Sequence, residues 1–107
     1  MAKLPVACSL TEAELVARRA GVLADVRRSQ RESRWLPDGV ALRFDAGPES
    51  LTMLATFIDL ERQCCAFLRF RLMVEAGGGP IWLTLTGPPG TRAFLEAELA
   101  GEGPEAS

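Results

Sequence analysis

The amino-acid sequence predicts an α+β fold: a small two-layer domain with the element order α-β-α-β-β-α, in which helices pack on one face of a three-stranded sheet. Three observations support this class. Apolar residues recur at helical spacing in three segments, and they alternate with polar residues in three others. Turns that contain glycine and proline separate the two kinds of segment.

The first predicted helix begins at a capping box, because Thr11 and Glu14 have the T-x-x-E spacing that satisfies free N–H groups at a helix start. It runs to about residue 30, and its apolar stripe predicts that one side of the helix covers the core. The stripe comprises Leu15, Val22 and Val26, flanked by Val16 and Leu23.

Two more helices follow. The second opens at Pro48 or Ser50 and ends near Phe67, and the third runs from its cap at Thr91 to about Leu99. The strands are predicted at residues 40–45, 69–75 and 81–86, where the side chains of the two faces alternate. The last two strands form a hairpin through AGGGP. The outer face of the sheet then carries Arg43, Arg69, Arg71, Trp82 and Thr84.

The composition predicts one soluble domain over residues 6–100, followed by a disordered tail at 101–107. A net charge of −2 gives no reason to expect nucleic acid or an anionic membrane as a partner. The N-terminus lacks the apolar region of a signal peptide, which predicts a cytoplasmic protein with reduced thiols. Three cysteines, an odd number, also argue against a disulfide framework.

The segment ERQCCAFLRF, residues 61–70, carries the most unusual feature of the chain. At about 100° per residue, Glu61 falls in the middle of the apolar arc of the second helix, between Cys64 and Cys65 in angle. Spacings of three and four residues bring helix side chains into contact. A carboxylate buried there needs a partner or a proton, and Arg43, Arg69 or Arg71 could supply the partner across the sheet.

Cys8 adds a third sulfur. It precedes the predicted cap Thr11 by three residues, so the helix N-terminus would favour its thiolate. Cys64 and Cys65 lie near a helix C-terminus, where the dipole disfavours a thiolate. A metal, Cys8 or a nearby arginine would have to compensate.

The chain resembles a family of small, largely uncharacterised bacterial proteins. The matching segments are ACSL at 7–10, ERQCCAFLRF at 61–70, GGGPIWLTLTGPPG at 77–90 and FLEAEL at 94–99. The family often has proline where this chain has Ala66, which would end the helix at the cysteines. The resemblance implies that Cys8, Cys64 and Cys65 act together, in a setting of heavy-metal or arsenic resistance.

Three functions remain open. The first is binding of a soft or borderline metal ion (Zn, Hg or Cu(I)) through Cys8, Cys64, Cys65 and Glu61, because thiolates are the ligands that such ions prefer. The second is an interaction module whose cysteines are structural. The third is a thiol-disulfide oxidoreductase that uses Cys64 and Cys65 with Cys8. Trp82 and Met73 on the outer sheet face also suggest a homodimer contact.

Overall fold

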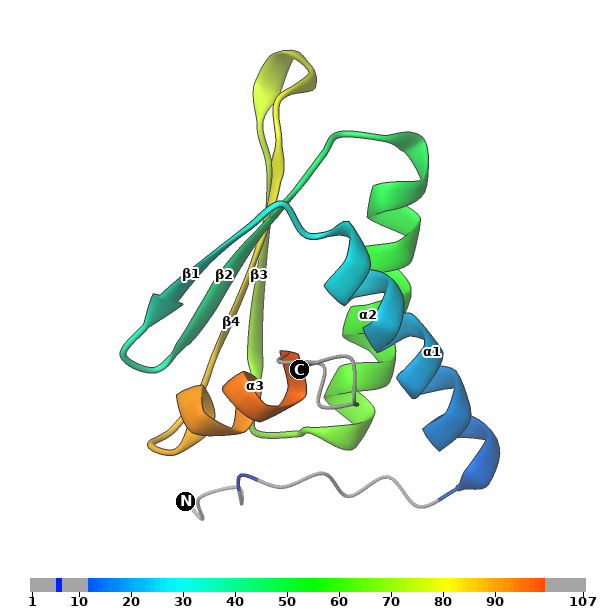
Figure 1. The fold of residues 1–107 in the computed structure, drawn as a ribbon, viewed down its shortest axis with the longest axis vertical. Coiled ribbons are helices and arrows are strands. Elements are labelled where there is room, and N and C mark those ends of the chain that lie inside the picture. Colours follow the sequence, from blue (N-terminus) through cyan, green and yellow to red (C-terminus); the bar gives the residue numbers. More distant parts are fainter. Residues whose placement is uncertain (1–5, 7–11, 100–107) are drawn as a thin grey trace.

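The computed structural model describes residue 6 and residues 12–99. Three helices, α1 (Ala13–Ser29), α2 (Pro48–Cys64) and α3 (Thr91–Leu99), accompany a sheet of four strands (Figure 1). The strands are β1 (Glu32–Leu36), β2 (Gly39–Phe44), β3 (Arg69–Val74) and β4 (Ile81–Thr86), and a short 3-10 turn, η1 (Ala76–Gly78), joins β3 to β4. The α+β class predicted from the sequence is confirmed.

The sheet differs from the prediction by one strand. Every neighbouring pair in the order β1-β2-β4-β3 is antiparallel, so β1 adds an edge that the sequence analysis left out. Charged residues within β1 obscure the alternation of apolar and polar side chains that would have predicted a strand. The turn at Pro37 and Asp38 did indicate where such a strand would end. This turn joins β1 to β2. The first residue of β2, Gly39, must lack a side chain, because a Cβ there would lie 1.8 Å from the carbonyl oxygen of Leu85.

One face of the sheet carries the core. The inward side chains of β2 and β4 are fully buried, and all three helices contribute to the same cluster. The helices α1 and α2 run side by side, and α3 contacts β2 (Figure 1). The core side chains include Val40, Leu42 and Phe44 from β2, Ile81, Leu83 and Leu85 from β4, and Val26, Leu54, Phe57 and Leu95 from the helices.

The opposite face of the sheet is polar, as expected from the alternation. Arg43 lies opposite Trp82 in the β2–β4 register, and the guanidinium of Arg34 lies 4.7 Å from the centre of the Trp82 ring. Glu32 joins this face through ion pairs to Arg34 and Arg43. None of the helices in the described part of the chain has the length and apolar character that a membrane span requires.

The ends of two helices also bear on the predictions. The helix α1 begins at Ala13, and the predicted cap Thr11 lies outside the described residues. The helix α2 ends at Cys64, three residues before the predicted end near Phe67. Cys65 leaves the helical conformation with φ −119° and ψ 77°, so the two cysteines stand at the boundary between helix and loop. The predicted tail, residues 101–107, lies outside the described residues.

Candidate thiol site

The end of α2 places Glu61, Cys64 and Cys65 in the protein interior. Glu61 is 1% exposed, and both cysteines are 0% exposed. The N–H of Cys65 donates to the carbonyl oxygen of Glu61 at 2.6 Å, which closes the last turn of the helix. The helical periodicity of this segment therefore predicted its burial correctly, including that of the carboxylate.

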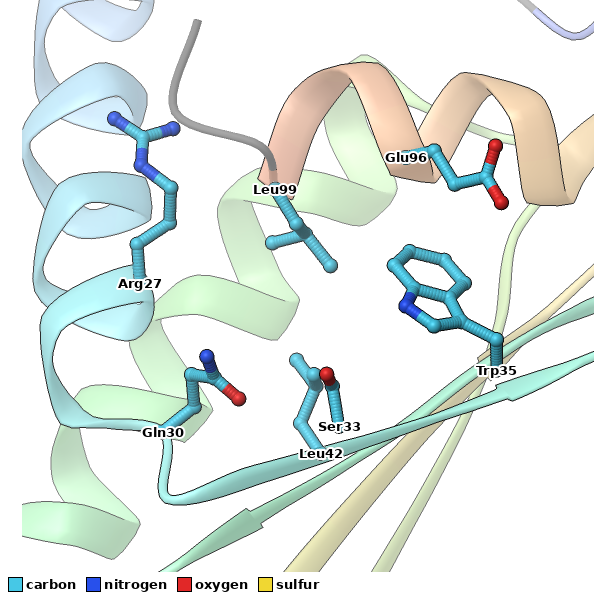
Figure 2. A pocket seen from close by; sticks show the side chains of 7 residues that line it. All are labelled: Arg27, Gln30, Ser33, Trp35, Leu42, Glu96 and Leu99. Carbon is cyan, nitrogen blue, oxygen red and sulfur yellow. The ribbon is translucent and has the colours of Figure 1, made fainter. Parts of the chain in front are cut away.

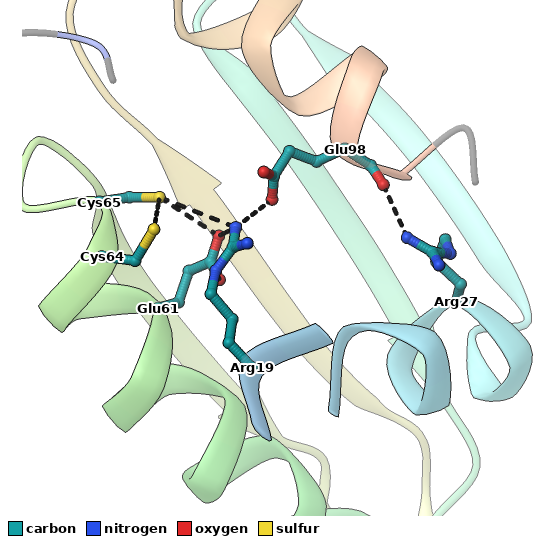
Figure 3. A network of polar contacts seen from close by, with 6 residues as sticks. All are labelled: Arg19, Arg27, Glu61, Cys64, Cys65 and Glu98. Atoms are coloured by element: carbon teal, nitrogen blue, oxygen red, sulfur yellow. Dashed lines mark hydrogen bonds and ion pairs between the residues drawn. The ribbon is translucent and has the colours of Figure 1, made fainter. Parts of the chain in front are cut away.

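The partner of Glu61 is Arg19 from α1 (Figure 3). Its Nε donates to Oε1 of Glu61 at 2.9 Å, and its Nη2 donates to Oε2 at 3.0 Å. The prediction that Arg43, Arg69 or Arg71 would fill this role was wrong. These three arginines alternate with the core residues of their strands, so they lie on the outer face, which the sheet itself separates from Glu61.

A second carboxylate completes the charge cluster. Nη2 of Arg19 also donates to Oε1 of Glu98 in α3, and Arg27 holds the Glu98 carbonyl oxygen at 3.0 Å through its Nη1 (Figure 3). Burial alone would lower the pKa of Arg19, but the hydrogen bond to Glu61 and the charges of Glu61 and Glu98 raise it overall. Burial and the charge of Glu61 raise the pKa of Glu98, against the opposing effect of Arg19.

The thiol of Cys65 lies against this cluster. Its Sγ is 3.6 Å from Oε2 of Glu61, to which it donates, 4.0 Å from Nη2 of Arg19 and 3.5 Å from Sγ of Cys64. Burial, followed by the negative charge of Glu61, raises the pKa of the Cys65 thiol to about 12, and the charge of Arg19 offsets only part of this. At neutral pH, Cys65 is therefore a protonated thiol.

The two adjacent cysteines differ in oxidation state. Cys65 is a free thiol, whereas Cys64 is disulfide-bonded and does not titrate. This differs from the expectation that all the thiols are reduced. The third predicted site residue, Cys8, lies outside the described residues.

The predicted metal site rests partly on residues beyond the described range. Within residues 12–99, the acidic and cysteine side chains form no group of three that could hold a metal ion. Both carboxylate oxygens of Glu61 accept hydrogen bonds from Arg19, so this predicted ligand is already engaged. Metal binding through Cys8, Cys64 and Cys65 stays a prediction.

Two members of the charge cluster, Arg19 and Glu98, were missed by the sequence analysis although the signal was present. On α1, Arg19 falls within the stripe of Leu15, Val26 and Leu23 at about 100° per residue, just as Glu61 does on α2. Glu98 follows the buried Leu95 by three residues, on the inward side of α3. A charged residue within an apolar stripe marked each member of the cluster.

Two hollows flank this part of the molecule. A groove of about 330 Å³ between α1 and α3 is bordered by Arg19 and Glu98 themselves, so the cluster reaches the surface there. A cavity of about 300 Å³ lies between α1, α3 and the β1–β2 hairpin, with Trp35 and Leu42 on its wall (Figure 2). Within the described structure, Oε1 of Gln30 beside it is buried without a hydrogen-bond partner. Among the described residues, no cysteine lines either hollow.

Comparison of the chain with protein-family models, with curated proteins and with solved structures finds no match. The resemblance to the bacterial family therefore stays a prediction, and the geometry of the thiol site is the basis for a functional proposal.

Proposed function

We propose that the protein is a thiol–disulfide redox protein in which Cys64 carries a disulfide and Cys65 is the thiol that exchanges with it. One observation supports this most strongly. The free thiol of Cys65 lies 3.5 Å from the disulfide-bonded sulfur of Cys64 and 3.6 Å from a buried carboxylate of Glu61. Thiol–disulfide exchange needs these three components: an attacking sulfur, a disulfide and a group that takes the proton.

We assign Cys8 as the residue that supplies the other sulfur of this disulfide. The chain has three cysteines, and Cys65 is a free thiol, so Cys8 is the remaining cysteine of the same chain. A disulfide between the adjacent Cys64 and Cys65 would close a strained ring, which further favours a distant partner.

The exchange step conserves atoms and electrons. Cys65 transfers its thiol proton to Glu61, and the resulting thiolate attacks the sulfur of Cys8. The bond between Cys8 and Cys64 breaks while a bond between Cys8 and Cys65 forms, and Cys64 leaves as a thiolate that takes up the proton. Opening either disulfide to two thiols requires two electrons from an external dithiol.

The charge cluster would control this step. A thiolate of high pKa is a strong nucleophile, but little of it is present at neutral pH, so the exchange depends on the proton acceptor beside it. Glu61 lies in contact with the thiol, and Arg19 holds its carboxylate in place through two hydrogen bonds. Loss of Glu61 should therefore lower the rate of exchange without changing which disulfides form.

A second candidate is soft-metal binding by the reduced form. The 3.5 Å separation of the two sulfurs favours it, because both could approach one ion after the disulfide is reduced. Cys8 would complete the set of thiolates for Zn, Hg or Cu(I). In this function the disulfide would be an oxidised resting state, and reduction would precede metal uptake.

Equilibration in thiol–disulfide buffers of graded potential tests the redox function. The protein is quenched by alkylation at each potential, and mass spectrometry of its peptides counts free thiols. We expect wild type to interconvert between one and three free thiols. Cys65→Ser should retain a disulfide that contains Cys64, and Cys64→Ser should form one that contains Cys65. Three free thiols at every potential would overturn the proposal.

Matched variants test the role of the carboxylate. Glu61→Gln should slow exchange at least about tenfold relative to Glu96→Gln, an exposed control on α3, because a positioned proton acceptor accelerates such steps by about that factor or more. Equal rates in both would show that Glu61 takes no part. Titration of the reduced protein with Hg(II) and Zn(II) tests the second candidate, which predicts that one equivalent protects all three cysteines from alkylation.

A further inference from the structure

Strand β3 is an edge of the sheet and ends in three exposed apolar residues. The sheet order β1-β2-β4-β3 leaves its far side without a neighbouring strand in the described structure, and its hairpin with β4 projects beyond the helices (Figure 1). Leu72, Met73 and Val74 are 39%, 51% and 54% exposed. An exposed apolar edge strand is a template for pairing with another chain.

The hydrogen-bonding pattern identifies the backbone groups at this edge. The N–H of Glu75 donates to the carbonyl oxygen of Pro80 at 3.2 Å, so Glu75 faces β4. Because successive residues of an antiparallel strand alternate in direction, Arg69, Arg71 and Met73 also face β4. The N–H and C=O groups of Phe70, Leu72 and Val74 therefore point to the free edge.

We propose that this free edge pairs with the same strand of a second copy of the chain, antiparallel, with Leu72 opposite Leu72. This register places Phe70 opposite Val74 and Arg69 opposite Glu75 of the partner subunit, on both sides of the two-fold axis. The edge-facing residues then form about six main-chain hydrogen bonds across the interface. The two sheets become one continuous eight-stranded sheet.

The side chains fit this register on both faces. Phe70, Leu72 and Val74 lie opposite Leu85, Leu83 and Ile81 of β4, so they share the apolar face of the sheet. Pairing would place these three apolar side chains of one chain next to the same three of the other chain, around the two-fold axis. On the outer face, Arg69 and Glu75 form opposite-charge cross-strand pairs, which stabilise a sheet.

Other registers fit less well. A shift by one residue sets an edge-facing residue against one that faces β4, which breaks the ladder of hydrogen bonds. A shift of the axis to Arg71 sets two like charges directly opposite each other, which is destabilising. A shift to Met73 pairs Arg71 with Glu75 but shortens the ladder, because the strand ends at Val74 and η1 begins at Ala76. The register centred on Leu72 uses the whole strand.

Analytical ultracentrifugation of the full chain under reducing conditions tests this pairing, and reduction excludes disulfide-linked dimers. Wild type should dimerise. Arg69→Glu and Glu75→Arg should each raise the dimer dissociation constant about tenfold, since each replaces two attractive pairs by two repulsive ones. The double exchange of both residues should restore the wild-type constant. Arg71→Glu tests the alternative register centred on Met73, in which Arg71 would lie opposite Glu75 of the partner subunit. If the register is centred on Leu72, Glu75→Arg should not reverse any effect of Arg71→Glu on the dissociation constant.

A backbone variant separates the edge from the outer face. Proline is tolerated in an edge strand where its N–H would face outward, so Leu72→Pro should abolish dimerisation while circular dichroism shows a folded monomer. If Leu72→Pro unfolds the chain, the charge exchange still decides the question. A monomeric wild type at all concentrations would overturn the proposal, as would a dimer that Trp82→Ala disrupts and the charge variants leave unchanged.

Discussion

Two ion pairs of the same length occupy opposite environments in this molecule. Arg19 and Glu61 lie 2.9 Å apart with side chains that are 13% and 1% exposed, and Arg92 and Glu96 lie 2.9 Å apart with side chains that are 46% and 49% exposed. The first pair joins α1 to α2 and reaches α3 through Glu98, whereas the second lies within one helix. The N–O distances of the two pairs are therefore equal, and the pairs differ in their burial and in the number of helices that they connect.

The comparison shows that removing a partner has different consequences in the two places. In water, a broken surface pair is solvated on both sides, so little free energy is lost. In the interior, the remaining charge has neither water nor a counter-ion, so its desolvation is uncompensated. The buried pair also adjoins Cys65, whose thiol pKa is raised first by burial and then by the charge of Glu61.

The largest expected effect comes from Arg19→Met, which leaves Glu61 buried without its partner. We expect the free energy of unfolding to fall by about 3–5 kcal/mol, the usual cost of breaking a buried ion pair from one side. Urea denaturation measures this. Replacement of both partners, Arg19→Leu with Glu61→Leu, should cost less than Arg19→Met alone. A loss under 1 kcal/mol for Arg19→Met would mean that Glu61 is accessible to solvent.

A smaller effect concerns pH. The pKa of Cys65 in the folded state, about 12, exceeds its ordinary value of 9.0, so the folded state holds the thiol proton more tightly. This contribution to stability is complete below pH 9 and is lost as the pH rises toward 12. Between pH 7 and pH 10 we expect a loss on the order of 1 kcal/mol. The chain has no tyrosine or histidine to obscure this window.

The control for this pH dependence is Cys65→Ala. Its free energy of unfolding is measured by urea denaturation at the same pH values. Between pH 7 and pH 10 it should fall less than that of wild type, by a difference on the order of 1 kcal/mol. Parallel curves for the two proteins would show that the thiol ionises in the folded state as readily as in the unfolded chain.

The smallest effect is expected from Arg92→Met in the exposed pair. Pairs with a spacing of four residues on a helix surface contribute about 0.3–0.5 kcal/mol, so the free energy of unfolding should change by no more than this. Added salt should reduce the difference between wild type and variant. A loss comparable to that of Arg19→Met would contradict the contrast between the two environments.

The fold could be predicted from the sequence to the extent that local pattern controls it. The strand at 81–86 has strong alternation and the helix at 91–99 has a clear start, and the structure places them at Ile81–Thr86 and Thr91–Leu99. Strand β1 was missed because ESRWL lacks a local apolar pattern, and pairing with β2 stabilises it instead. The end of α2 was misjudged because Ala66 and Phe67 are compatible with a helix, while the packed structure turns the chain at Cys65.

The sequence by itself determined the burial of Glu61 beside Cys65, because helical periodicity assigns each residue of α2 to a face before any other element is known. Only the tertiary structure decided that Arg19 and Glu98 meet that carboxylate. They lie 42 residues before and 37 residues after it, on two other helices, and no local rule relates positions so far apart. The partners of a buried charge are chosen by how helices pack, and helix packing is a property of the whole chain.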